Sequence, residues 1–236
     1  MYLCKFQRGL DSSTLADRFN FEAWSQLVEY FGTEKHHIWD LKKCPVPIKL
    51  VRIKTNFKHT GFVDVDAVSA IQDYLDIREK KTGKLMQEGQ ALFLNIFQKP
   101  ITENWVHRGF FDLTKRSGVQ KEIKLKNSIK YEKDSHELRD LLKSTLLVCN
   151  TRYGVSDHVT GHKPKDSYEK QSSLYSDNLR NEYSKASKKI NMFSNMSVYM
   201  KGDEDNQVLQ KQLDEQKRIN QVIKGNVEKI LSHLKI

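Results

Sequence analysis

Four short motifs carry side chains that could act together on a phosphodiester. They are Lys54-Thr55, His136-Glu137-Leu138-Arg139, Gly161-His162 and a tyrosine a few residues on, Tyr168. A phosphodiester repels nucleophiles through its own charge, and its transition state gathers more charge on the non-bridging oxygens. A guanidinium presents a fork of donors that matches those oxygens. These residue types therefore indicate phosphate chemistry if the fold brings them together.

The second motif begins a predicted helix. Asp134 followed by Glu137 is a capping-box pattern at a helix start. At about 100° per residue, the leucines that follow lie on one side, and His136, Arg139 and Lys143 lie together on the other. We expect the leucines to be buried and the three cationic side chains to be presented side by side. The alternative is an ordinary solvated face.

The Lys54-Thr55 pair is expected in the turn of a β-hairpin. Two short extended runs, residues 48–53 and 60–65, flank a polar segment at residues 54–59. Short β-branched runs on either side of a polar turn are typical of antiparallel strands. Lys54 would then project from the start of the turn.

The rest of the domain is predicted to be helical. Apolar residues recur every four positions through residues 11–31, where Asp11, Ser12 or Ser13 could cap the helix. A second helix is expected from residue 68 to about 81, a short strand at 91–94, and a third helix opening at 100–102. The fold class is therefore mainly α with a small antiparallel β-sheet (α+β), over a domain of residues 1–201.

Charge favours an anionic partner. The 236 residues include 40 Lys and Arg against 30 Asp and Glu, a net charge of +10. Residues 112–201 hold 18 Lys and Arg against 11 Asp and Glu, so +7 of this charge lies there. Within residues 115–130 six cationic residues face the single acid Glu122, with little apolar sequence between them. This pattern favours nucleic acid over a membrane surface, and a solvated face is the simpler alternative.

Composition excludes several other classes of protein. No apolar run approaches the roughly 20 residues that cross a bilayer, and the N-terminus lacks a signal-peptide pattern. Cys4, Cys44 and Cys149 are widely spaced and odd in number, which argues against structural zinc and for a reducing interior. We therefore expect a cytoplasmic protein without a membrane partner.

The last segment, residues 202–236, is predicted to form a coiled-coil tail. Alternating four- and three-residue steps from Leu209 to Leu234 place apolar residues at six of eight seam positions. A polar Asn220 in such a seam fixes register and oligomer number, whereas Gly225 weakens the helix. A lone helix that packs back on the domain is the alternative. Met192, Met196 and Met200 form a further stripe, suited to subunit contact or to core packing.

The motifs, in this order, resemble the catalytic domain of the tyrosine recombinases (phage-type integrases), especially their divergent archaeal members. The resemblance spans residues 1–190. It implies that Arg139 holds the scissile phosphate, assisted by His136 and His162. It also implies that Lys54 protonates the departing 5′-oxygen, and that Tyr168 attacks phosphorus and stays joined to the 3′ end. The covalent step separates cleavage from rejoining, so the resemblance implies no ATP, metal or other cofactor.

Histidine spacing suggests one further alternative at this site. His158 and His162 are four residues apart, as in some metal pairs, but Gly161 interrupts a helix there and no acidic ligand accompanies them. The remaining histidines are expected to be surface or packing residues. No metal site is therefore predicted.

The sequence departs from the family pattern near its start. The family has a second arginine just after a Gly-Leu pair, but here Gly9-Leu10 is followed by Asp11. Arg8 or Arg18 could supply the missing guanidinium. The family also has an N-terminal DNA-clamping domain, and the resemblance here starts almost at Met1. We therefore expect either that another polypeptide supplies this domain or that the gene is a truncated remnant.

The position of the nucleophile is a further departure. The family places it about nine residues after the Gly-His histidine, whereas Tyr168 follows His162 by six residues and Tyr175 by thirteen. Tyr168 is preferred, as the product of a shortened loop, and Tyr175 is the alternative.

Three functions follow from these features. The first is a site-specific recombinase or integrase that acts on double-stranded DNA as a homo-oligomer. The second is a catalytically impaired DNA-binding or regulatory remnant of the same fold, oligomerised by its coiled coil. The third is an interaction protein whose basic charge is incidental.

Overall fold

The computed structural model describes residues 1–125, 128–152, 154–163 and 176–195. The chain divides into two units, Met1–Asn191 and Met192–Ile236. Of the second unit, only residues 192–195 are described, as a helical turn with Met192 and Phe193 exposed. Met196, Met200 and the predicted coiled coil lie outside the described residues, so the tail and the boundary at residue 201 stay predictions.

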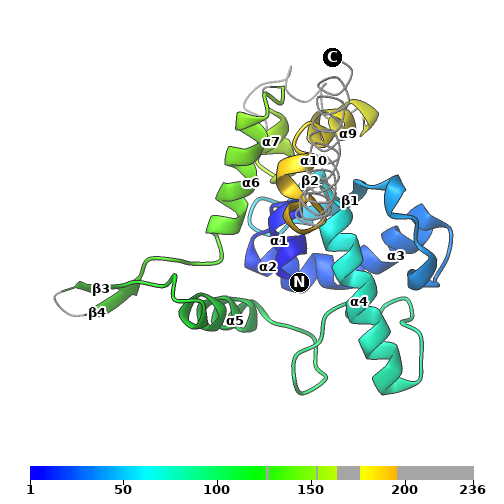
Figure 1. Ribbon diagram of the computed structural model, residues 1–236, viewed down its shortest axis with the longest axis horizontal. Coiled ribbons are helices and arrows are strands. Elements are labelled where there is room, and N and C mark those ends of the chain that lie inside the picture. The colour runs from blue at the N-terminus through cyan, green and yellow to red at the C-terminus, as the bar shows by residue number, and fades with distance from the viewer. Residues whose placement is uncertain (126–127, 153, 164–175, 196–236) are drawn as a thin grey trace, which may run out of the picture. The chain divides into compact units, whose positions relative to one another are not determined.

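The first unit is mainly helical with two small antiparallel sheets (Figure 1), which confirms the predicted α+β class. Its first half contains α1 (Tyr2–Arg8), α2 (Ser12–Thr14), the π-helical turn η1 (Leu15–Phe19), α3 (Asn20–Phe31), the 3₁₀ turns η2 (His36–Ile38) and η3 (Leu41–Lys43), β1 (Val46–Arg52), β2 (Phe57–Val63) and α4 (Val65–Thr82). Its second half contains α5 (Glu103–Arg116), β3 (Glu122–Leu125), β4 (Ser128–Tyr131), α6 (Glu137–Val148), α7 (Val155–Val159), α9 (Ser176–Ser184) and α10 (Ser187–Ile190). In the described part of the chain, no helix is both long enough and apolar enough to cross a bilayer.

The predicted helix at residues 11–31 is confirmed as three consecutive helical segments, α2, η1 and α3. Asp11 is its cap, since its carboxylate accepts a hydrogen bond from the Thr14 backbone nitrogen at 2.8 Å. The four-residue apolar repeat is buried along its whole length, at Leu15, Phe19, Ala23, Leu27 and Phe31. The cap thus fixes the position of Asp11 at the point where the chain leaves α1.

The β1–β2 hairpin is also confirmed, with a shorter turn than predicted. Arg52 pairs with Phe57, so the turn contains only residues 53–56. Asn56 closes it with a φ of 48°. The second strand begins early because the side chain of His59 is buried and continues the inward face of the hairpin.

The predicted strand at residues 91–94 is wrong. These residues are mostly buried, but the only strand-like pairing is an isolated bridge between Leu94 and Pro100. Asn20 takes the place of a partner strand: its side chain accepts a hydrogen bond from the Phe93 nitrogen at 2.6 Å and donates one to the Phe93 oxygen at 3.2 Å. A buried asparagine can satisfy the backbone here, so no sheet is needed.

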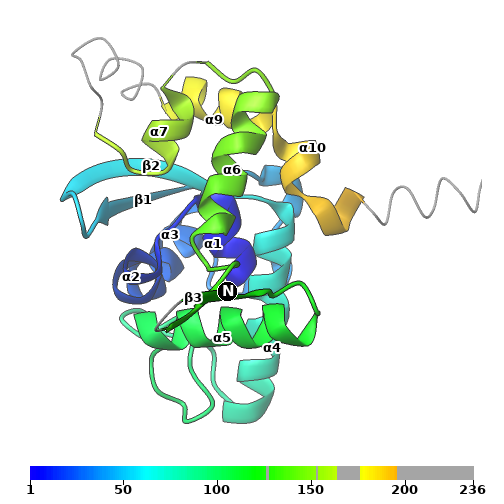
Figure 2. The same cartoon turned by 90° about the vertical axis from the view of Figure 1, so that its left-hand side faces the viewer.

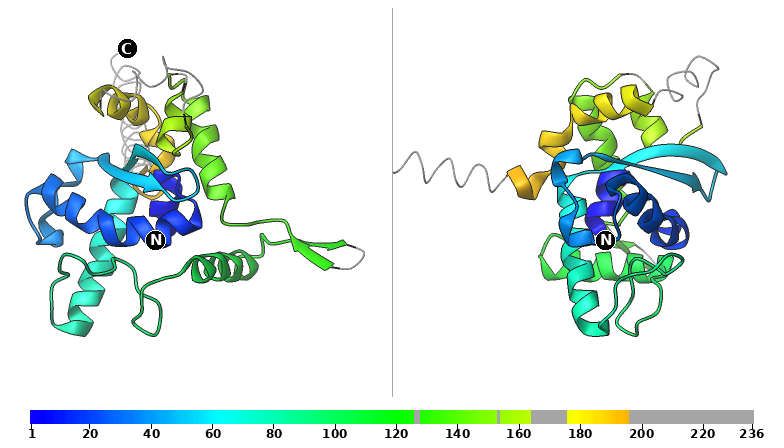
Figure 3. Two further views of the ribbon diagram at one scale, coloured as in Figure 1. Left: turned by 180° about the vertical axis from the view of Figure 1, so that it is seen from behind. Right: turned by 90° about the vertical axis from the view of Figure 1, so that its right-hand side faces the viewer.

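The β1–β2 hairpin lies between two layers of helices. α1, α3 and η1 pack on one side of it, and α7 and α9 pack on the other (Figure 2). One apolar cluster fills the space around α3, β1 and α4. A second cluster joins α6, α7, α9 and α10 to Phe6 of α1 and Phe62 of β2. The turn of the hairpin extends to the edge of this unit (Figures 2 and 3).

The β3–β4 hairpin was not predicted. It leaves the helical layers between α5 and α6 (Figures 1 and 3). Tyr131 at its base packs edge-on against Phe111 of α5, with ring centroids 4.5 Å apart. Much of the basic run at residues 115–130 therefore belongs to an antiparallel ribbon rather than to a helix.

Candidate functional site

Arg139 and His162 lie together in the structure. Arg139, in the first turn of α6, is 2% exposed. One terminal nitrogen of its guanidinium donates to the Gly9 carbonyl oxygen at 2.5 Å, and the other lies 3.5 Å from both ring nitrogens of His162. The guanidinium therefore links the end of α1 to the Gly-His loop that follows α7.

The predicted orientation of α6 is wrong for Arg139. It lies on the buried face with Leu142 and Leu146, whereas Leu141 is 47% exposed. The physical reason is the acceptor provided by Gly9, which makes burial of the guanidinium favourable, since a buried charge must be hydrogen-bonded. Arg139 is thus a fixed part of the interior and not a member of a solvated face.

His162 is more accessible and is surrounded by polar groups. Its side chain is 41% exposed. Its Nδ1 lies 3.0 Å from the Thr160 hydroxyl and 3.5 Å from a carboxylate oxygen of Asp157, which also pairs with Lys143 at 2.7 Å. Burial and the nearby charges of Arg139 and Lys143 lower the pKa of His162, which favours a neutral ring at pH 7.

A second guanidinium reaches the same region, from a residue that the sequence did not single out. Arg52, the last residue of β1, donates from Nε to the Asp11 carboxylate at 2.9 Å. Its terminal nitrogen lies 3.4 Å from the Gly161 carbonyl oxygen. Burial alone would raise the pKa of Asp11, but hydrogen bonds from Thr14 and Arg52 hold it well below its usual range. Asp11 is therefore charged and anchors Arg52.

The two guanidiniums affect each other electrostatically. Burial, followed by the positive charge of Arg52, lowers the pKa of Arg139 to about 10, so Arg139 is still protonated at neutral pH. Two positive charges against the single carboxylate of Asp11 leave these three groups with a charge of +1. This part of the site favours an anion.

The hairpin turn is fixed against the same loop. The Thr55 hydroxyl donates to the Gly161 carbonyl oxygen at 3.4 Å. Lys54, the preceding residue, is exposed in this turn. The structure therefore places the backbone of Lys54 beside the Gly-His loop and leaves its ammonium in solvent.

Gly161 has two physical reasons to be glycine. Its φ is +75°, and a Cβ at this position would lie 2.7 Å from the imidazole of His59. Gly161→Ala should therefore destabilise the fold by about 1–3 kcal/mol beyond the cost of the left-handed backbone. Gly83→Ala is the matched control, because Gly83 has a φ of +67° and no atom near its Cβ position. Urea unfolding of both variants measures the difference, and equal losses would contradict this explanation.

The remaining predicted site residues are placed as follows. His136 is exposed and precedes α6, where its backbone nitrogen donates to the Asp134 carboxylate at 2.6 Å. Tyr168 and Tyr175 lie outside the described residues. Tyr183, a further tyrosine that was not among the predicted site residues, is fully buried and donates to the Gln7 carbonyl oxygen at 2.8 Å, so it is a packing residue.

Neither arginine suggested as a replacement for the missing one contacts the site. Arg8 is fully buried and donates to the carbonyl oxygens of Val159 and Ile48. Arg18 is half-exposed and pairs with Glu22 on the surface at 3.3 Å. The second guanidinium that reaches this region comes instead from Arg52. Period-2 alternation could have found it, because the buried face of β1 runs through Val46, Ile48, Leu50 and Arg52.

The two histidines that are four residues apart make different contacts in the structure. His158 is buried, and its Nε2 accepts from the Thr60 backbone nitrogen at 3.3 Å. In the described part of the chain, neither His158 nor His162 belongs to a group of side chains spaced for a metal ion.

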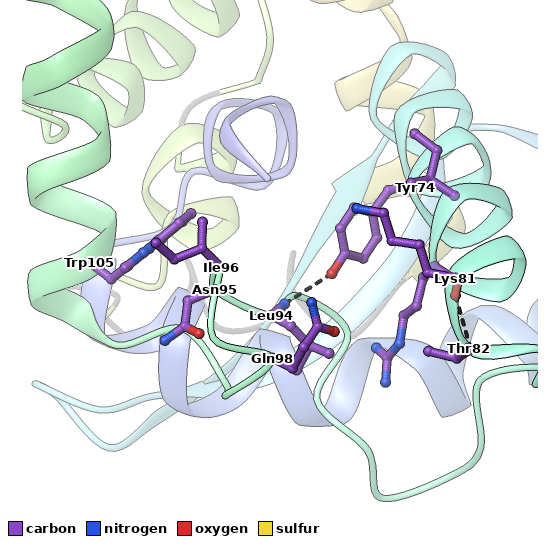
Figure 4. A pocket seen from close by; sticks show the side chains of 10 residues that line it. Tyr74, Lys81, Thr82, Leu94, Asn95, Ile96, Gln98 and Trp105 are labelled. Carbon is purple, nitrogen blue, oxygen red and sulfur yellow. Dashed lines mark hydrogen bonds between the residues drawn. The ribbon is translucent and has the colours of Figure 1, made fainter.

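A cavity of about 360 Å³ lies away from these residues (Figure 4). It is lined by the C-terminal half of α4, by the loop at residues 94–98 and by Trp105 of α5. None of Arg52, Arg139 and His162 lines it. The cluster around Arg139 is therefore separate from this cavity.

Comparisons with known proteins find no match by sequence and a weak structural similarity. No protein-family model matches the chain, and no curated protein matches it by sequence. A search of solved structures finds the crystal structure of XerA recombinase, at 18% identity and a TM-score of 0.40. The match covers 76% of this chain and 62% of the XerA chain. A likeness of this size is too weak to assign a family or an activity.

Proposed function

We propose that this chain breaks and rejoins double-stranded DNA through a covalent 3′-phosphotyrosine intermediate, as tyrosine recombinases do. The observation that supports it best is the joint position of Arg139, Arg52 and His162. Two guanidiniums beside one imidazole form an arrangement suited to the non-bridging oxygens of a phosphodiester. The basic β3–β4 ribbon and the net charge of +10 fit a nucleic-acid partner.

Exposure suggests how a phosphate would approach. The side chains of His162 and Arg52 are 41% and 11% exposed, whereas Arg139 is 2% exposed. A phosphate would meet His162 and the outer edge of Arg52 first, with Arg139 behind them as a fixed charge. Because all three are hydrogen-bonded before substrate arrives, little reorganisation is needed during the reaction.

Besides these three residues, the chemical step would use Tyr168 as the nucleophile and Lys54 as the acid for the leaving oxygen. The phenol oxygen of Tyr168 attacks phosphorus, a tyrosine–phosphorus bond forms, and the bond to the 5′-oxygen breaks. The neutral ring of His162 accepts the phenol proton, and the ammonium of Lys54 gives a proton to the departing 5′-oxygen. Rejoining is the reverse reaction, with the 5′-hydroxyl as nucleophile, so the bond energy is conserved and no ATP is consumed.

A nicked substrate tests this proposal directly. The full chain is mixed with duplexes of randomised central sequence. Each duplex is nicked so that cleavage releases a short fragment that carries the new 5′-hydroxyl, and the loss of this fragment prevents rejoining. We expect DNA–protein adducts that survive denaturing electrophoresis and that disappear in Tyr168→Phe. Loss in Tyr175→Phe instead would reassign the nucleophile to Tyr175. Adducts that survive both substitutions would contradict a phosphotyrosine at either position.

A non-catalytic DNA-binding role is the second candidate, and Asp11 is the observation that favours it. Asp11 follows the Gly9-Leu10 pair, after which the tyrosine recombinases have an arginine, and its carboxylate neutralises part of the charge of Arg52. In that case the chain binds DNA without forming adducts. Binding must still weaken steeply with salt, because each neutralised phosphate releases condensed counterions. Absence of salt-dependent binding would leave only an interaction protein with incidental charge.

A further inference from the structure

A second group of chemically capable side chains lies outside the candidate site, between η2 and α4. The Nε2 atom of His36 lies 2.8 Å from a carboxylate oxygen of Asp76 and 3.9 Å from one of Glu79. One ligand atom from each residue lies within 4.8 Å of the other two. Ligand atoms that share one tetrahedral ion at about 2.0–2.2 Å lie roughly 3.3–3.6 Å apart, so rotation of the two half-exposed carboxylates would be enough to place all three atoms around one ion.

The packing of η2 against α4 positions His36, Asp76 and Glu79 before any ion binds. Gln72, Asp76 and Glu79 follow one another at intervals of four and three residues, so they form a single stripe along α4. The Gln72 side chain donates to the carbonyl oxygens of His36 and Trp39, at 2.7 and 3.3 Å. The amide thus ties η2 to α4, directly beside the two carboxylates.

The imidazole of His36 is buried with only part of its polar surface satisfied. Its side chain is 1% exposed, and its ring packs edge-on against Trp39 and His37. The Nδ1 atom has no hydrogen-bond partner in the structure. One hydrogen bond to Asp76 is modest compensation for burying such a ring, whereas a coordination bond at Nε2 would compensate for more.

The net charge of this cluster also favours a cation. In the described part of the chain, the ion pairs of Asp76 and Glu79 are both with His36 and with no lysine or arginine. Two carboxylates beside one imidazole leave this cluster with a net negative charge, although the protein as a whole is strongly basic. The carboxylates are 44% and 40% exposed, so an ion can enter from solvent.

We propose that His36, Asp76 and Glu79 bind a divalent transition-metal ion of the zinc class, which fastens η2 to α4. One imidazole nitrogen and two carboxylate oxygens form a mixed ligand set that Zn²⁺ accepts, whereas Mg²⁺ and Ca²⁺ prefer oxygen ligands alone. The role is structural, since none of the three residues belongs to the site around Arg139. The inference therefore stands whether or not the chain acts on DNA.

Calorimetric titration of the metal-free full chain with Zn²⁺ tests the proposal. We expect one site that binds Zn²⁺ and not Mg²⁺, and a melting temperature that rises with Zn²⁺ concentration because the ion binds the folded state. Glu79→Gln should weaken binding by more than about tenfold, since it removes a ligand. The His36–Asp76 hydrogen bond remains in that variant, so its melting temperature in a chelator should match that of the unaltered chain.

Glu88→Gln is the matched control, because Glu88 is an exposed acid outside the cluster and its change removes the same charge. We expect it to bind Zn²⁺ as the unaltered chain does. Absence of Zn²⁺ binding by the unaltered chain would overturn the proposal. Equal affinities for the Glu79→Gln and Glu88→Gln variants would also overturn it, since Zn²⁺ would then bind elsewhere, for instance at an accessible cysteine.

Discussion

Changing Arg52 to alanine should lower the rate of DNA–protein adduct formation by about 10²–10³-fold. This is the typical effect of removing one preorganised donor from a transition-state site. Arg52→Lys should recover only part of the loss, because an ammonium keeps the charge but not the planar fork that faces both Asp11 and a phosphate. The measurement is single-turnover adduct formation on the nicked duplex.

Arg18→Ala is the control for this prediction, since it removes the same charge from a surface ion pair with Glu22. It should leave the rate of adduct formation within about twofold, as expected of an exposed pair. Removal of Arg52 also leaves the Asp11 carboxylate buried without its partner, which destabilises the fold. Rates are therefore compared at a temperature where urea unfolding shows each variant to be folded. Equal rates for the Arg18 and Arg52 variants would show that Arg52 is not the second phosphate-binding arginine.

Acid should unfold this protein at a pH where most of its carboxylates are still charged. Burial, followed by the charge of Arg8, lowers the pKa of His59 to about 2 and that of His158 to about 4. Both rings are therefore neutral in the folded state. An unfolded chain takes up a proton at each of them near pH 6.5.

The direction in which pH changes the free energy of unfolding follows from proton uptake. Between pH 6.5 and 4 the unfolded state binds more protons at these two histidines, so the free energy of unfolding falls as the pH falls. Each histidine contributes about 1.4 kcal/mol per pH unit in this range. Urea unfolding at several pH values between 7.5 and 4.5 measures the slope.

Two variants, His158→Gln and His37→Gln, distinguish the contribution of a buried histidine to the slope from that of an exposed one. Glutamine at position 158 keeps an acceptor for the Thr60 nitrogen but does not titrate. It should therefore remove about half of the slope that His59 and His158 contribute together. His37 is exposed, and its replacement should leave the slope unchanged. Identical slopes in the two variants would contradict the assignment of acid sensitivity to the buried rings.

Much of the fold follows from local patterns. The cap at Asp11, the four-residue repeat behind it and the β1–β2 hairpin depend on neighbours within a few residues, and each is present in the structure. The strand predicted at residues 91–94 failed because its backbone groups are satisfied by Asn20, which lies about seventy residues away in sequence. A partner at that distance leaves no trace in the local pattern.

The candidate site was only partly predictable for the same reason. Sequence alone determined the residue types, so that Arg139 and His162 stood out through their motifs and their spacing. The helical pattern placed Arg139 on the exposed face of α6, because periodicity cannot register an acceptor such as the Gly9 carbonyl on another element. Alternation along β1 could have marked Arg52 as an inward-facing residue, but not what it binds.

Local sequence patterns and composition were enough to predict a basic, mainly helical chain of the α+β class. Only the tertiary structure decided that Arg52, and neither Arg8 nor Arg18, supplies the second guanidinium. The physical reason is that a buried charge goes where it finds partners. The Asp11 carboxylate and the Gly161 carbonyl come together around Arg52 only when α2, β1 and the loop after α7 pack against one another.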